Sequence, residues 1–108
     1  MVGKVGEDLT VEQGYEAAKL VGLNLLATLQ NNLGDLDRVK RVVKLFGLVN
    51  CTDDFKQQPA VMNGCSDLMV KVFGAENGSH VRSAVGTNAL PLGVAVEVEA
   101  VFELHPAK

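Results

Sequence analysis

An alternating pattern between residues 94 and 104 constrains the fold of this chain more than any other feature. One set of positions is apolar and comprises Val94, Val96, Val98, Ala100, Phe102 and Leu104. The positions between them hold three glutamates and two apolar residues, namely Ala95, Glu97, Glu99, Val101 and Glu103. Side chains of a β-strand alternate between its two faces, so the pattern predicts a strand with one buried face and one face that carries carboxylates.

A helix is predicted from residue 11 to residue 33. Thr10 and Gln13 form a capping-box pattern at its start, apolar residues then recur at helical spacing, and Gly34 stands where a C-terminal stop belongs. Glycine inside a helix costs up to about 1 kcal/mol relative to alanine. Two glycines in this helix therefore predict close packing against a neighbour: Gly14 and Gly22.

A second helix is bracketed by Pro59 near its start and Gly74 just past its end. Its apolar stripe consists of Val61, Cys65, Leu68, Met69 and Val72. Between the helices, residues 39–50 form a β-branched run that is apolar on both faces, which predicts a central strand. Residues 82–86 predict a further short strand. The basic residues near the first strand fit a solvated strand edge better than an anion-binding stripe: Arg38, Lys40, Arg41 and Lys44.

The order helix, strand, helix, strand, strand predicts an α+β fold. We expect two amphipathic helices and a small mixed β-sheet to pack as a two-layer sandwich, with both helices on one face of the sheet. At 108 residues the chain is predicted to be one domain, residues 1–108. The opposite face of the sheet has no cover within the chain, and Glu97 is expected on it.

Arg82 and Ala84 are expected to share this uncovered face with Glu97, because the valines beside Arg82 look like the inward-facing residues of the short strand. A guanidinium held on a strand binds a carboxylate with two parallel hydrogen bonds, and a nearby carboxylate can orient or deprotonate a water molecule. The pair therefore fits a pocket for a small acid. A cross-strand ion pair on a solvated sheet, worth at most about 1 kcal/mol, is the more common arrangement of such residues.

Composition argues against several classes of function. The net charge is −3, and the chain has one Tyr and no Trp, so neither a basic nucleic-acid footprint nor a base-stacking platform is expected. No apolar run approaches the roughly 18 residues of a membrane span, and the N-terminus lacks the apolar core of a signal peptide. Cys51 and Cys65 have no metal-ligand or redox spacing, which favours reduced thiols in a cytoplasmic protein. His80 and His105 are expected to be surface histidines.

Several motifs together resemble the RidA/YjgF family. They are the pair Arg82-Ser83 that opens a strand, the connection Leu90-Pro91, and the closing strand Val94 to Ala100 with the pattern V-x-V-E-x-E-A. The resemblance runs from about Gly6 to Leu104 and implies the chorismate-mutase-like (YjgF) fold. Family chains usually begin with a β-hairpin, and this chain is expected to be N-terminally short of it.

The resemblance also implies a function and a site. Family members hydrolyse reactive 2-imino acids, such as 2-iminopropanoate and 2-iminobutanoate, to 2-keto acids and ammonia, in clefts between the subunits of a homotrimer. Arg82 then corresponds to the residue that clamps the substrate carboxylate, the backbone N–H of Ala84 to a second donor, Glu97 to the residue that positions the attacking water, and Asn63 to a residue that lines the cleft. No metal or cofactor takes part. The alternative is a non-catalytic trimer that binds small carboxylates or regulates a partner. Endoribonuclease activity, also attached to the family, is disfavoured by the acidic balance.

Overall fold

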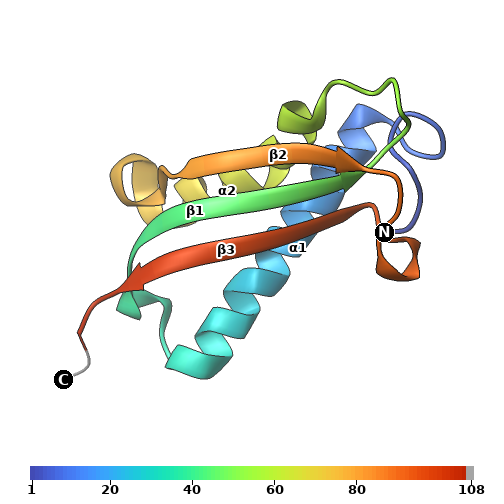
Figure 1. Cartoon of the computed structure of the whole chain (residues 1–108). Coiled ribbons are helices and arrows are strands. Elements are labelled where there is room, and N and C mark those ends of the chain that lie inside the picture. Colours follow the sequence, from blue (N-terminus) through green and yellow to red (C-terminus); the bar gives the residue numbers. More distant parts are fainter. Residues whose placement is uncertain (107–108) are drawn as a thin grey trace.

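The computed structural model describes residues 1–106 and contains two long helices and three strands. Their order along the chain is α1 (Val11–Leu33), β1 (Val39–Asn50), α2 (Gln58–Gly78), β2 (Val81–Thr87) and β3 (Val96–Leu104). The strands form one sheet in the order β2-β1-β3, in which β1 pairs parallel with β2 and antiparallel with β3 (Figure 1). The mixed sheet and the central position of β1 confirm the sequence prediction.

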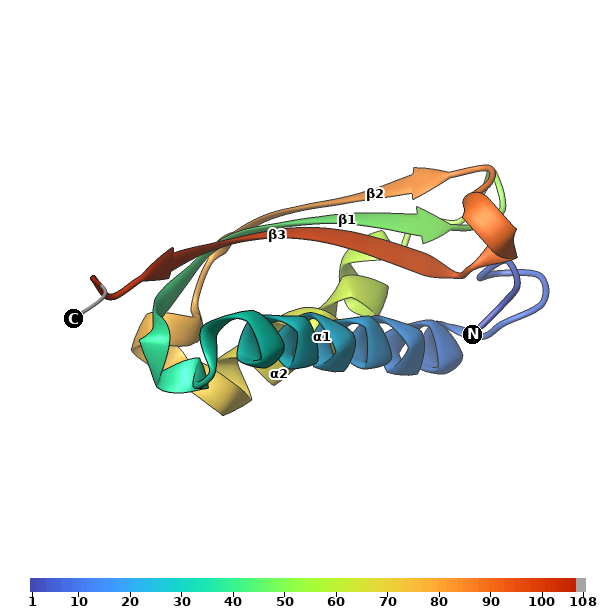
Figure 2. The same ribbon diagram turned by 90° about the horizontal axis from the view of Figure 1, so that it is seen from below.

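The helices cover one face of the sheet and leave the other face bare (Figure 2). Fully buried side chains of β1 face the helices and form the centre of the core, among them Val42, Leu45 and Val49. The apolar face of β3 packs on the same side, as predicted. The strand begins at Val96 rather than Val94, because residues 91–93 form a 3₁₀ turn before it.

The predicted ends of α1 are confirmed. The Thr10 side chain accepts a hydrogen bond from the Gln13 backbone N–H at 3.1 Å, and the Gln13 side chain accepts one from the Thr10 backbone N–H at 2.9 Å. These reciprocal bonds satisfy two of the backbone donors that a helix start leaves free. Gly34 ends the helix with φ 84°, a left-handed conformation that favours glycine.

Glycines allow α1 and α2 to approach each other closely. A Cβ atom added at Gly22 would lie 2.8 Å from Cδ2 of Leu68, and one added at Gly14 would lie 2.9 Å from Cγ2 of Val61. On the opposite helix, a Cβ atom added at Gly64 would lie only 2.0 Å from the backbone oxygen of Tyr15. The two glycines singled out in the sequence thus have the predicted role, and Gly64 adds a third contact point.

The second helix differs from the prediction at its C-terminal end. The chain adopts a non-helical conformation at Gly74, with φ 88°, but helical turns resume and continue to Gly78. The first four residues of the predicted stripe are buried, whereas Val72 is 43% exposed. The predicted stripe therefore lies over the core as far as Met69.

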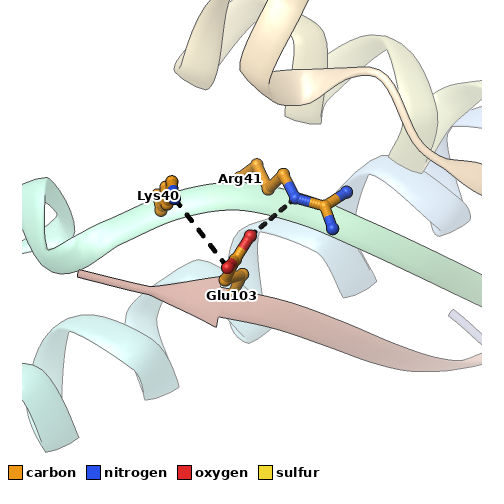
Figure 3. A network of polar contacts seen from close by, with 3 residues as sticks. All are labelled: Lys40, Arg41 and Glu103. Carbon is orange, nitrogen blue, oxygen red and sulfur yellow. Dashed lines mark hydrogen bonds and ion pairs between the residues drawn. The ribbon is translucent and has the colours of Figure 1, made fainter. Parts of the chain in front are cut away.

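The basic residues of β1 do not mark a sheet edge, because β1 is the central strand. Arg41 donates a hydrogen bond from Nε to Oε1 of Glu103 at 2.7 Å, and Nζ of Lys40 lies 3.9 Å from Oε2 of the same carboxylate (Figure 3). These two cations lower the pKa of Glu103, the hydrogen bond from Arg41 contributing most. Glu103 is therefore a partner in a surface ion-pair network.

Candidate functional site

Arg82 lies on the helix-covered face of the sheet, which contradicts the predicted orientation. Its pairing partner in the parallel ladder is Leu45, which is fully buried beneath the helices. Paired residues point to the same face of a sheet, so Arg82 and Ala84 face α2. Val81 and Val85 instead face the bare side, where they are 65% and 41% exposed.

The wrong prediction has a physical cause. Alternation along a strand defines two sets of residues but does not say which set the helices cover. The valines looked like core residues because they are apolar, whereas β2 is an edge strand whose helix side borders polar residues of α2.

Arg82 and Glu97 therefore do not form a site within one chain. Glu97, on β3, pairs with Leu48 of β1, and Arg82, on β2, pairs with Leu45 of β1. The two residues therefore lie two strands apart across the sheet and three residues apart along it. With about 4.8 Å between strands and about 3.3 Å per residue, their backbones are roughly 14 Å apart. They also point to opposite faces, which excludes the cross-strand ion pair as well.

The structure does bring Arg82 together with Asn63. Nη1 of Arg82 donates hydrogen bonds to Oδ1 of Asn63 at 2.8 Å and to Oγ of Ser66 at 3.1 Å. Asn63 and Ser66 are three residues apart on α2 and so share one face of the helix. Both contacts use Nη1, and within residues 1–106 the Nε and Nη2 donors of Arg82 have no protein partner. That edge of the guanidinium matches the two oxygens of a carboxylate.

His80 belongs to the same cluster, so it is not a free surface histidine as expected. Its Nε2 lies 2.9 Å from Oγ of Ser66, and its Nδ1 lies 2.7 Å from the carbonyl oxygen of Gly78. Neither Ser66 nor His80 was expected in a site. Helical spacing from Asn63 could have indicated Ser66, but nothing in the sequence indicated that the loop after α2 turns His80 back onto the helix.

Cys65 lies beside this cluster but is not a nucleophile. Its side chain is buried, and burial raises the pKa of the Cys65 thiol to about 11, although the nearby Arg82 cation opposes the rise. A thiol with this pKa is protonated at neutral pH and therefore unreactive. Both Cys51 and Cys65 are free and buried.

Among the hollows that residues 1–106 form, two lie on the sheet or at its end, away from the Arg82 cluster. One, of about 320 Å³, sits where β1 and β2 end and is lined by residues including Cys51, Gln58 and Thr87. The other, of about 280 Å³, lies on the bare sheet face between Lys44, Phe46, Glu99 and Val101. Within residues 1–106, no group of three or more His, Cys, Asp or Glu side chains is arranged to hold a metal ion. No helix in that part of the chain is long and apolar enough to cross a membrane.

The fold and the site define a two-layer α+β protein with an arginine-centred polar cluster beside an edge strand. Comparison with known proteins identifies its family. Residues 1–104 match the family model described as "YjgF/chorismate_mutase-like, putative endoribonuclease". The chain belongs to this YjgF/chorismate mutase-like family, as the sequence motifs indicated.

Individual relatives agree with this assignment. The chain is 51% identical over 105 residues to Protein TCP17 of Trypanosoma cruzi, a match that covers 97% of this chain and 66% of that protein. A crystal structure of the protein Atu1372 of unknown function from Agrobacterium tumefaciens superimposes with a TM-score of 0.94 at 40% identity, covering 97% of this chain and 66% of that one. A structure described as a "putative endoribonuclease" from Shewanella oneidensis superimposes with a TM-score of 0.90 at 34% identity, covering 95% and 68%. The chain thus spans about two thirds of the length of these relatives.

Proposed function

We propose that this protein hydrolyses small reactive 2-imino acids, of the 2-iminopropanoate or 2-iminobutanoate type, to 2-keto acids and ammonia. The observation that carries the proposal is the hydrogen bonding of the Arg82 guanidinium. Asn63 and Ser66 hold one nitrogen of its guanidinium, and within residues 1–106 the other two nitrogens have no protein partner. A guanidinium fixed in this way is a preorganised clamp for the carboxylate that every 2-imino acid carries.

Ala84 extends the clamp along β2. This strand has a neighbour on one side only among the described residues, so its outer edge presents backbone N–H and C=O groups that are not used in the sheet. The backbone N–H of Ala84 serves as a second donor to the substrate carboxylate, and this role needs no particular side chain at that position.

Glu97 completes the site only from a second copy of the chain. It lies on the opposite face from Arg82, so a site that contains both residues is built between subunits. The bare face supports such assembly, because it exposes the apolar residues Val81, Val85 and Val101. We therefore propose a homotrimer in which Glu97 of one subunit positions the attacking water near Arg82 of another. We also propose a cytoplasmic location, which two free buried cysteines support.

Substitution of Arg82 tests the proposal. Ammonia release from freshly generated 2-iminopropanoate should fall at least 100-fold in Arg82→Ala, because the carboxylate loses its only paired cation. Arg82→Lys should recover a small part of the activity, since an ammonium cannot bind both carboxylate oxygens in one plane. Arg41→Lys is the control: it alters an arginine on the neighbouring strand, in the surface ion-pair network, and should keep wild-type activity. Unchanged turnover in Arg82→Ala would overturn the proposal.

The alternative, a module that binds small carboxylates without turnover, is favoured by one observation. A single chain offers the Arg82 clamp but not Glu97 beside it. Thermal stabilisation by a 2-keto acid, lost in Arg82→Ala and accompanied by no imine hydrolysis, would select this alternative. Endoribonuclease activity, which the family description names, has less support because the net charge of −3 provides no phosphate-binding footprint.

A further inference from the structure

Ser66 and His80 form a hydrogen-bonded dyad whose proton positions follow from the geometry. The carbonyl oxygen of Gly78 can only accept a hydrogen bond, so the Nδ1 atom of His80 at 2.7 Å carries a proton. In the neutral ring, Nε2 then has the free electron pair and accepts the hydroxyl proton of Ser66 at 2.9 Å. The Ser66 oxygen in turn accepts a proton from Nη1 of Arg82 at 3.1 Å. A hydroxyl is thus held by a base, and the base is oriented by a third group.

We propose that His80, acting through Ser66, accepts the proton released by the attacking water during hydrolysis of the imine. This inference rests on the proposed function and adds to it a proton acceptor in the chain that clamps the substrate. In this proposal the Ser66 oxygen receives the proton from the water, since it is bonded to Nη1 of the guanidinium whose other two nitrogens face the substrate carboxylate. His80 acts through Ser66, and Glu97 of the second subunit orients the water.

The proposed proton path conserves atoms and charge. In the iminium form of the substrate, the water oxygen bonds to the imine carbon, and the C=N π pair moves to nitrogen. One water proton passes to the Ser66 oxygen while the Ser66 hydroxyl proton passes to Nε2 of His80, giving an imidazolium. The imidazolium then returns its proton by the same path to the amine nitrogen, and the C–N bond breaks as the hydroxyl oxygen forms the carbonyl. The hydroxyl proton leaves with ammonia as ammonium.

Ionisable side chains stand next to the Ser66–His80 dyad along α2, β1 and β2. The nearby titratable groups are Cys65 and Asp67 on α2, Arg82 on β2, and Lys44 on β1, which pairs with Val81 on the bare face of the sheet. Burial keeps the Cys65 thiol protonated, with a pKa of about 11. Asp67 accepts a hydrogen bond from the Tyr15 hydroxyl at 2.9 Å. His80 is the acceptor that the Ser66 hydroxyl contacts.

His80→Gln separates proton transfer from mere positioning of Arg82. The glutamine side chain can still accept the Ser66 hydroxyl hydrogen bond, so it keeps Ser66 and Arg82 in place, but it cannot take up a proton. We expect kcat for 2-iminopropanoate to fall roughly 100-fold, with KM changed less than about threefold. The pH profile of kcat should also change, because a glutamine side chain does not ionise. His105→Gln, which changes the exposed histidine near the C-terminus, is the matched control and should keep both the rate and the pH profile.

The outcomes distinguish this inference from the proposed function. If wild-type protein turns over the imine and His80→Gln keeps its kcat and pH profile, the relay is wrong while the proposed function stands. An increase in KM with unchanged kcat in His80→Gln would also overturn the relay, because it would show that His80 only holds Arg82 in place. If the wild-type protein shows no turnover at all, the proposed function fails and the relay fails with it.

Discussion

At the scale of single residues, Cys65 shows how the core and the candidate site share the same helix. Its side chain is packed in the core, and the next residue along α2 is Ser66, which bonds Arg82 and His80. The thiol lies close enough to Arg82 for the cation to favour its ionised form, yet burial has the larger effect on its pKa. Burial therefore outweighs the Arg82 cation and keeps the Cys65 thiol neutral.

The raised pKa of Cys65 predicts a loss of stability at alkaline pH. The pKa rises from its ordinary value of 9.0 to about 11 in the folded chain, so the folded state holds this proton more tightly than the unfolded state. The contribution is complete below about pH 9 and is lost as the pH rises through 11. Two pKa units correspond to at most about 3 kcal/mol.

Denaturant unfolding at pH 7.5 and pH 11 measures this effect. Tyrosine and lysine residues also titrate in this range, so wild-type protein is compared with Cys65→Ala at each pH. The variant is expected to be less stable at pH 7.5 because of the cavity it leaves, and the difference from wild type should shrink toward pH 11. A constant difference at both values would contradict the prediction.

At the scale of elements, the contact between α1 and α2 depends on a close backbone approach. Gly64 meets the Tyr15 carbonyl with no room for a Cβ atom, whereas the atoms nearest to Gly14 and Gly22 belong to side chains rather than to the backbone. The contact matters for the candidate site because Asn63 and Ser66 are on either side of Gly64 along α2. A shift of α2 away from α1 would displace both residues that hold Arg82.

Gly64→Ala is therefore expected to destabilise the protein. An alanine in a helix normally stabilises it by up to about 1 kcal/mol relative to glycine. Here the added carbon would lie 2.0 Å from a backbone oxygen, so we expect a loss of about 1–3 kcal/mol in the free energy of unfolding. Gly22→Ala, opposite the flexible Leu68 side chain, should cost less. A Gly64→Ala variant as stable as wild type would show that the helices separate more easily than the structure indicates.

At the scale of the whole molecule, the two faces of the sheet differ in how they are covered. One face is covered by two helices (Figure 2). The other face exposes apolar side chains between charged ones. A bare face of this kind suits association with further copies of the chain. Under the proposed function, the catalytic site is complete only in the assembled oligomer, because Arg82 and Glu97 lie on opposite faces of the sheet.

Val101→Lys tests the assembly. Val101 is 53% exposed on the bare face, so a lysine should be tolerated in the single subunit but not in an interface between apolar faces. We expect light scattering to give the mass of a trimer for the wild-type protein and of a monomer for the variant, with imine hydrolysis lost in parallel. Leu20→Lys is the control, because Leu20 is 47% exposed but lies on α1, in the other layer. A wild-type monomer, or a trimeric Val101→Lys variant, would contradict the proposed interface.

The sequence by itself determined the helices and strands of this protein, because capping residues and side-chain alternation act between close neighbours along the chain. The capping box and Gly34 set the ends of α1, alternation set the strand character of residues 96–104, and the motif around Arg82 indicated the family. Only the tertiary structure decided which face each side chain of β2 joined. Orientation depends on pairing with β1 and on the position of α2, which are contacts between residues far apart in the chain. The same contacts separated Arg82 from Glu97 and brought Ser66 and His80 beside the arginine. Helical spacing links Ser66 to Asn63, but no spacing in the sequence could place His80 there.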